Sequence, residues 1–356
     1  MSSEVTSIEE KSNNSKNIIT YSAILITFLI ALWLSFQSEG PSKMPKVVTD
    51  EFTFTAWVND GEDYLKKNYR WFTKIIAGYI KNGYYFLEDF LIDSPWLLIA
   101  AIIFLPCLIA GGLRLGLYSL FVIYFWGGTG MWDESMQTLA LMGLSVLLCV
   151  VFGVTLGVMC SQSDRFDNFM KPILDTMQVM PAFVYLFPAL FFFGIGGAPA
   201  ILATMIYAMP PIIRLTNTGI RQVPEQTIES ATSFGSSKLQ LLFKIKIPLS
   251  LPSIMMGINQ VIMMALALVV LACFIGAEGI GGQVWLAIRN LDVGWAMEGG
   301  LCILFMAIMF DRFGLALSKP KTTLPSDVQK FYLLPQALEK YIICLLYTSD
   351  AADEMR

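Results

Sequence analysis

Long apolar runs alternate with short polar connections along most of the chain. A helix needs about 20 apolar residues to cross the hydrocarbon core of a bilayer, because each residue adds only about 1.5 Å to its length. The pattern therefore predicts an all-α, polytopic membrane protein with about eight transmembrane helices. The predicted spans are residues 18–36, 96–110, 115–132, 138–160, 173–196, 200–215, 254–275 and 298–317.

The amino-terminal third differs in pattern from the rest of the chain. Residues 1–17 are polar and are predicted to be disordered. The run 18–36 is interpreted as a retained helix, since it has neither a basic region directly before it nor a small-residue cleavage site. Residues 37–94 place apolar side chains at helical spacing opposite lysines, which is typical of an amphipathic helix lying on a membrane surface, here on the external side. A small soluble subdomain packed on its own apolar stripe remains an alternative.

A tight helical hairpin is predicted next, because only GGLR at residues 111–114 separates two apolar runs. It completes an N-terminal scaffold over residues 18–132.

The predicted core domain covers residues 133–318. Gly153 and Gly157 lie four residues apart in its first span and would let helix backbones approach closely. Residues 161–172 are predicted to form a charged loop, and residues 276–295 a glycine-rich loop. Prolines within two adjacent spans are candidate kinks, either for packing or at a gate: Pro181, Pro188, Pro210 and Pro211.

A polar segment interrupts the apolar pattern at residues 229–248. Its lysines and its Ser and Thr side chains exclude it from hydrocarbon. We predict two short helices, with Glu229 in the first turn of one, joined at Gly235 and ended by Pro248. Such a projection offers a soluble partner a surface to hold. It would lie in a cytoplasmic loop over residues 217–253.

The distribution of Lys and Arg predicts the orientation. In the eight-span arrangement the short loops on one side carry nearly all of these residues, whereas the opposite short loops hold only Arg289. Positive residues mark the cytoplasmic side, so both termini are predicted to be cytoplasmic, with residues 319–356 as a tail. Residues 344–356 differ in character from what precedes them and resemble a read-through or assembly remnant as much as a natural end.

Composition excludes several classes of function. At 55% apolar and 15% charged residues, the chain is too apolar for a soluble globule, and its net charge of −4 argues against a nucleic-acid partner. Histidine is absent, which removes the commonest metal ligand and general base, and no CxxC spacing occurs. No glycine cluster continues into the GK of a P-loop. We therefore expect no metal site, no catalytic residue and no cofactor bound by this chain, and a membrane-embedded enzyme has little support.

One part of the polar segment resembles a known motif. Its residues and their spacing are similar to the EAA loop of the membrane subunits of ATP-binding-cassette (ABC) importers. The resemblance implies that this loop docks into a cleft of a cytoplasmic ATPase subunit and passes its closure to the membrane helices. The matching residues are Glu229, Ser230, Ala231, Gly235, Ile245, Ile247 and Pro248, with serine and isoleucine in place of one alanine and of leucine.

Longer stretches resemble one branch of that family, the permease subunits of glycine betaine and proline betaine importers of the ProU or OpuA type. They lie at residues 175–199, 209–224 and 234–260, with further matches at 277–284 and 309–312. The resemblance implies a MetI-like core of five helices at about residues 138–317 and a place in the bacterial inner membrane. It also implies a homodimer, two ATPase subunits that hold ATP and Mg²⁺, and an external substrate-binding protein. The implied role is uptake of an osmoprotective quaternary amine.

The substrate path is predicted from aromatic side chains, because quaternary ammonium groups favour aromatic faces. The candidates are Phe183, Tyr185, Tyr207 and Phe274. The pattern leaves open which amine is carried: glycine betaine, proline betaine, choline, carnitine or trimethylamine N-oxide. An alternative function is a secondary transporter or channel for a small zwitterion that works without an ATPase.

Overall fold

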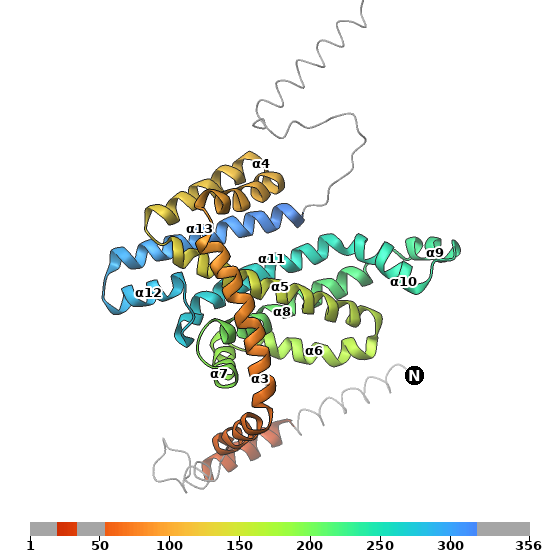
Figure 1. Cartoon of the computed structure of the whole chain (residues 1–356). Helices are drawn as coiled ribbons and strands as arrows, with labels where there is room; N and C mark the ends of the chain where they lie inside the picture. Colours follow the sequence, from red (N-terminus) through yellow and green to blue (C-terminus); the bar gives the residue numbers. More distant parts are fainter. Residues whose placement is uncertain (1–19, 34–53, 319–356) are drawn as a thin grey trace, which may run out of the picture. The chain divides into compact units, whose positions relative to one another are not determined.

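The computed structural model describes residues 20–33 and 54–318 of the chain (Figure 1). These residues form helices joined by short turns, and no strand occurs among them, so the all-α prediction is confirmed. The predictions of disorder for residues 1–17 and of a cytoplasmic tail for residues 319–356 lie outside the described residues.

The chain divides into two compact units, residues 1–70 and 71–356. The first contains an apolar helix, Thr20–Trp33, and the beginning of α3 (Phe54–Asp93), a helix of 40 residues. Lys66 pairs with Glu62 one turn earlier in α3. Residues 54–93 of the predicted amphipathic segment form one continuous helix. Its position on a membrane surface stays a prediction.

In the second unit, α4 (Trp96–Gly128) folds back on itself. Gly112 has φ 72° and ψ −169°, a backbone conformation that is not helical and interrupts α4. A side-chain carbon placed on Gly116 would lie 3.0 Å from the Phe104 ring, although twelve residues of straight helix would separate the two by about 18 Å. The reversal falls inside the GGLR sequence at residues 111–114.

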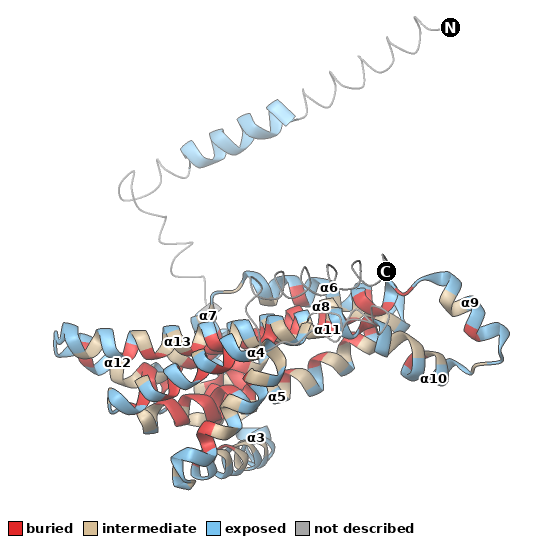
Figure 2. Ribbon diagram, turned by 90° about the horizontal axis from the view of Figure 1, so that it is seen from above, coloured by how far each residue is buried: buried red, intermediate tan, exposed pale blue. Residues whose placement is uncertain are grey.

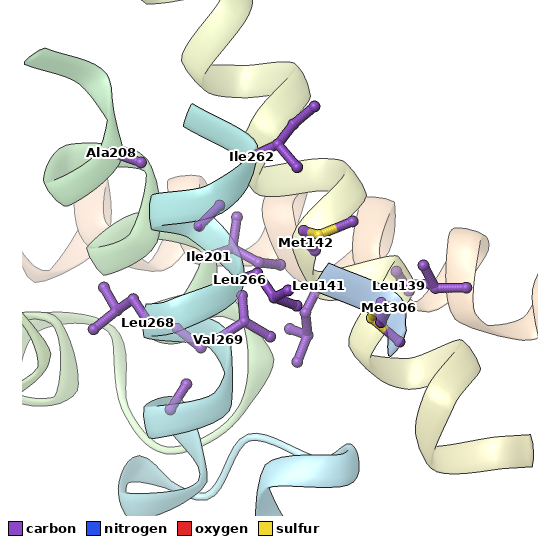
Figure 3. Close-up of a cluster of buried hydrophobic side chains, with 14 of the residues drawn as sticks. Leu139, Leu141, Met142, Ile201, Ala208, Ile262, Leu266, Leu268, Val269 and Met306 are labelled. Atoms are coloured by element: carbon purple, nitrogen blue, oxygen red, sulfur yellow. The ribbon is translucent and has the colours of Figure 1, made fainter. Parts of the chain in front are cut away.

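The core of the second unit is a bundle in which α8 (Gly197–Arg221) is the central helix. It packs between α5 (Trp132–Gln162) and α11 (Ile247–Leu271), and α13 (Val293–Ser318) packs against α11 and α4. Figure 2 shows the buried residues gathered where these helices meet. Figure 3 shows aliphatic and methionine side chains interlocked there, among them Leu141 from α5, Ile201 from α8 and Leu268 from α11.

Glycines allow α5 and α8 to approach closely. A side-chain carbon on Gly157 would lie 2.6 Å from Thr216 Cβ and 2.8 Å from the Ile213 carbonyl oxygen, both on α8. At Gly153 it would lie 2.3 Å from Ile212 Cγ2. Only a hydrogen atom fits at either position, which is the close backbone approach that glycines four residues apart predict.

Two predicted loops are wrong, because both contain helices. Residues 161–172 include the first half of α6 (Asp164–Val179), which begins where the Ser163 side chain accepts a hydrogen bond from the Phe166 amide, 3.4 Å away. Residues 276–295 contain α12 (Ile280–Arg289). Charge and glycine content indicated loops, whereas an N-cap serine and acidic first-turn residues start the first of these helices.

The predicted span 173–196 is not a straight helix. It is divided between α6 and α7 (Ala182–Phe193), whose axes meet at 102°. Five described helices are long and apolar enough to cross a membrane, or six if this bent pair is one span. The figure of eight is therefore approximate, and the difference comes from this bend, the folded α4 and the short helix Thr20–Trp33.

Candidate functional site: the coupling projection

Residues 225–246 form a projection beyond the end of the bundle, between α8 and α11 (Figure 1). Its first helix, α9 (Glu225–Ser233), ends in a left-handed turn at Gly235, where φ is 79°. The Ser236 amide donates to the Ala231 carbonyl at 3.1 Å, and the Gly235 amide donates to the Thr232 carbonyl at 2.9 Å. These two bonds form a Schellman motif, which is why glycine occupies this position.

Glu229 lies in the middle of α9 and not in its first turn. The helix begins at Glu225, so Glu229 is its fifth residue. Pro224 stands at the N-cap, and Glu225 is the acidic residue of the first turn. Glu229 and Ser230 are exposed, whereas Ala231 is buried. The predicted motif therefore turns a carboxylate outward and its alanine inward.

The second helix of the projection does not end at Pro248. After α10 (Lys238–Leu241), the chain widens into a π-helical turn, η1 (Leu242–Lys246), and continues into α11, near whose start Pro248 stands. Proline lacks an amide hydrogen and its ring crowds the carbonyl four residues earlier, and a π-turn removes that crowding. The projection is thus continuous with a membrane helix. The prediction that Pro248 ends the second helix is wrong.

Exposed apolar side chains mark the surface of the projection. Phe234 is 92% exposed, Leu239 68% and Phe243 63%. They stand among charged and polar residues, and the Ser237 and Gln240 side chains fix the start of α10 by a reciprocal capping box. Ile245 and Ile247 are half-buried at its base. Large apolar side chains held outside a bundle on a rigid, polar support are typical of a protein docking surface.

A charged network fastens the base of the projection to the bundle. Arg221, in the last turn of α8, donates to Asp164 Oδ1 at 2.6 Å, to Asn217 Oδ1 at 2.9 Å and to the Cys160 carbonyl at 2.8 Å. Asn217 donates in turn to Asp167 Oδ1 at 2.7 Å. Arg221 therefore ties the end of α8 to the end of α5 and the start of α6. Sequence reasoning used Arg221 only as an orientation signal, because partners from three helices are not visible in a linear pattern.

The candidate kink prolines fall into two groups. Pro181 is the N-cap of α7, at the 102° bend after α6, and Pro188 lies inside α7. Pro210 and Pro211 are buried inside α8, whose helix runs without interruption from Gly197 to Arg221. Of the four positions, Pro181 is the one at a large change of chain direction.

The candidate aromatic residues form two pairs. Phe183 lies 5.4 Å from Phe274 between ring centroids, and Tyr185 lies 5.7 Å from Tyr207. Trp285 of α12 extends the first pair, with its ring 4.7 Å from that of Phe274. Phe183, Phe274 and Trp285 are partly exposed, whereas Tyr185 is buried and its hydroxyl donates to the Met177 carbonyl at 2.6 Å. Sequence reasoning missed Trp285, which lies in a segment expected to be loop.

A polar contact joins α3 to the core at the end of the bundle away from the projection. Gln137 of α5 donates to Glu88 of α3 at 3.0 Å and to Glu278 at 2.9 Å. Burial raises the pKa of Glu88 above its ordinary value, although the hydrogen bond from Gln137 acts in the opposite direction. This buried carboxyl fixes α3 to the bundle at a cost in desolvation.

Among residues 20–33 and 54–318, no group of His, Cys, Asp and Glu could hold a metal ion. The described cysteines are free thiols.

Comparisons with known proteins identify relatives of this chain. Residues 150–317 match the family model described as "Binding-protein-dependent transport system inner membrane component". The glycine betaine/proline betaine transport system permease protein ProW of Escherichia coli is 40% identical over 270 residues, which cover 74% of this chain and 75% of that protein. The glycine betaine/carnitine transport permease protein GbuB of Listeria monocytogenes is 38% identical over 283 residues, covering 78% and 98%. The glycine betaine transport system permease protein OpuAB of Bacillus subtilis is 49% identical over 183 residues, covering 51% and 65%.

Several helices long and apolar enough to cross a membrane, packed into one bundle, define a multi-pass membrane protein. Together with the relatives, they give the narrower assignment: the chain belongs to the family of binding-protein-dependent transport system inner membrane components, the permeases of ABC importers.

Proposed function

We propose that this chain forms the translocation path of an ATP-driven importer for a quaternary-amine osmolyte such as glycine betaine or proline betaine. The observation that carries the proposal is the projection of residues 225–246, with its exposed Phe234, Leu239 and Phe243. The relatives that are named as glycine betaine permeases support the substrate class.

The proposed mechanism follows from how the projection is joined to the bundle. An ATPase that binds α9 and α10 closes around ATP and moves them together. Because α10 continues through η1 into α11, that movement displaces a membrane helix without an intervening loop. Arg221 carries the same displacement to α5 and α6 through its hydrogen bonds. Packed helices have few discrete arrangements, so the bundle switches between inward-open and outward-open states.

The remaining parts of the assembly are proposed from the family. Two copies of this chain pair in the bacterial inner membrane, two ATPase subunits hold ATP and Mg²⁺, and an extracytoplasmic protein delivers the solute. The projection faces the cytoplasm, since Lys238, Lys244 and Lys246 lie on it. Both chain termini are then cytoplasmic. This chain contributes binding surfaces and motion, and the hydrolysis of ATP occurs in the partner.

The proposed outer part of the substrate path includes Phe183, Phe274 and Trp285. These rings lie at the end of the bundle opposite the projection, where η2 (Ala272–Ile275) and α12 meet α7. Their partly exposed faces attract a quaternary ammonium group by cation–π interaction, worth about 0.5–2 kcal/mol for each ring. A quaternary ammonium group has no N–H to donate, so aromatic faces suit it better than carboxylate pairs do.

The projection is tested by copurification with the proposed ATPase partner. Phe234→Asp removes an exposed apolar side chain and adds a charge, and we expect it to lower the recovered ATPase more than tenfold, since a docking hot spot contributes at least about 2 kcal/mol. Phe169→Asp is the matched control, because Phe169 is 65% exposed on α6, outside the projection. Equal recovery with both variants contradicts the proposed docking site.

The alternative, a transporter without an ATPase, is tested with the same material. Proteoliposomes that contain the chain alone are given a sodium or proton gradient and labelled glycine betaine. The proposal expects no uptake until the ATPase, the binding protein and ATP are supplied.

A further inference from the structure

A large cavity lies at the projection end of the bundle, away from the proposed substrate path. Its volume is about 900 Å³, and it is bounded by α4, α11 and α13. Apolar side chains form its walls, including Leu115, Met256, Ile308 and Leu315. A cavity of this size accommodates a molecule of several hundred daltons.

Two arginines open into this apolar space. Arg114 follows the α4 reversal by two residues, and Arg312 lies in the last two turns of α13, so chain segments almost 200 residues apart bring the two guanidinium groups to one cavity. Neither makes a hydrogen bond or ion pair with the part of the chain that the structure describes. Asp311, the neighbour of Arg312 in sequence, does not line the cavity, and no other acidic side chain of the described residues does.

We propose that this cavity binds an anionic phospholipid from the leaflet on the projection side. Guanidinium groups bind phosphate oxygens through paired, charge-assisted hydrogen bonds, and the apolar walls fit acyl chains. Basic pockets between membrane helices at the cytoplasmic side are typical sites for acidic headgroups. A soluble phosphate compound gains nothing from the apolar walls, so the lipid is the occupant to which both features of the cavity point.

The site joins the hairpin of α4 to α13 and to α11, the helix that continues from the projection. Tyr118 donates its hydroxyl to the Phe305 carbonyl at 3.4 Å, and the rings of Phe121 and Phe125 pack against Phe305 just beyond the cavity. A lipid seated on Arg114 and Arg312 therefore adds a further contact between α4 and α13, in a place where protein side chains leave a gap.

The test measures lipid retention by the full-length chain. The purified protein is delipidated in detergent, incubated with phosphatidylglycerol or phosphatidylcholine, and analysed by native mass spectrometry. We expect phosphatidylglycerol to be retained at least tenfold more than phosphatidylcholine, and glycerol 3-phosphate, which has no acyl chains, not to compete. Arg114→Gln with Arg312→Gln should reduce the preference to below twofold, whereas the charge-matched control Arg165→Gln with Arg289→Gln should keep it.

A second variant removes the space and leaves the charges in place. Met256→Trp fills the cavity from α11, and it should lower phosphatidylglycerol retention at least fivefold while the melting temperature shows that the protein is folded. Equal retention of both lipids by the wild type, or retention that both variants preserve, overturns the proposal. So does photo-crosslinking from position 256 that captures residues beyond Ser318 or a second copy of the chain in place of lipid.

Discussion

The contact between α5 and α8 gives a prediction whose size follows from the structure. In Gly157→Ala, the new methyl group would stand 2.6 Å from Thr216 Cβ and 2.8 Å from the Ile213 carbonyl, and the latter is backbone that cannot rotate away. Overpacking of this kind costs about 1–3 kcal/mol. Replacing a helical glycine by alanine recovers about 1 kcal/mol of helix propensity. The net effect of Gly157→Ala is therefore a loss of up to about 2 kcal/mol.

Gly143 provides a control on the same helix. A side-chain carbon there meets no atom within 4 Å, so Gly143→Ala receives the propensity gain without the clash. The two variants should thus differ by about 1–3 kcal/mol, which corresponds to roughly 1–4 °C in the apparent melting temperature of a chain of 356 residues. The assay is thermal unfolding of the purified variants in detergent. If Gly157→Ala melts at or above Gly143→Ala, the proposed close approach of α5 and α8 is wrong.

Two further predictions concern the projection and its connection to the bundle, and a third concerns the buried Glu88 at the opposite end. Gly235→Ala forces a side chain into a left-handed turn at a cost of about 1–2 kcal/mol, which should lower ATPase copurification about fivefold or more. Gly235→Asn should lower it less, because asparagine tolerates this conformation better. Equal effects of the two variants would refute the role of backbone strain. Arg221→Lys should preserve ATPase binding but lower uptake per ATP hydrolysed, because a lysine cannot donate to Asp164, Asn217 and the Cys160 carbonyl at once. If ATPase binding and uptake instead fall by the same factor, this role of Arg221 is contradicted. Glu88→Gln should raise the melting temperature at neutral pH. Because the pKa of Glu88 is raised in the folded protein, its contribution to stability is present below the unfolded pKa of about 4.3 and is lost as pH rises through the folded pKa. Glu88→Gln should therefore also flatten the dependence of the melting temperature on pH. An unchanged pH dependence would argue against a buried carboxyl.

Hydropathy and spacing predicted the helical class, the apolar spans and the position of the projection. These features are encoded locally: apolar runs identify helices that can enter a membrane, and a lysine-rich segment between two such runs must leave it. Gly235 was also predictable, because a left-handed turn after a short helix requires glycine or a close substitute. The family motif added the expected docking partner.

What the sequence did not predict depends on contacts between distant segments or on competing local signals. Pro248 indicated a helix end, but the π-turn before it lets the helix continue, and no sequence rule separates the two outcomes. The charged residues 164–172 indicated a loop, although they start a helix whose carboxylates meet Arg221 from α8. Trp285 and the cavity at Arg114 and Arg312 were not predicted because only the folded bundle brings these side chains to their neighbours.

The central claim is that a partner ATPase drives transport through the projection. The most direct test of this claim is uptake of labelled glycine betaine by proteoliposomes that contain this chain, the binding protein, and either the active ATPase or a variant that binds but does not hydrolyse ATP. We predict uptake with the active ATPase only, and its loss when Phe234→Asp is introduced. Uptake at the same rate with the inactive ATPase, or undiminished uptake by the Phe234 variant, would contradict the central claim.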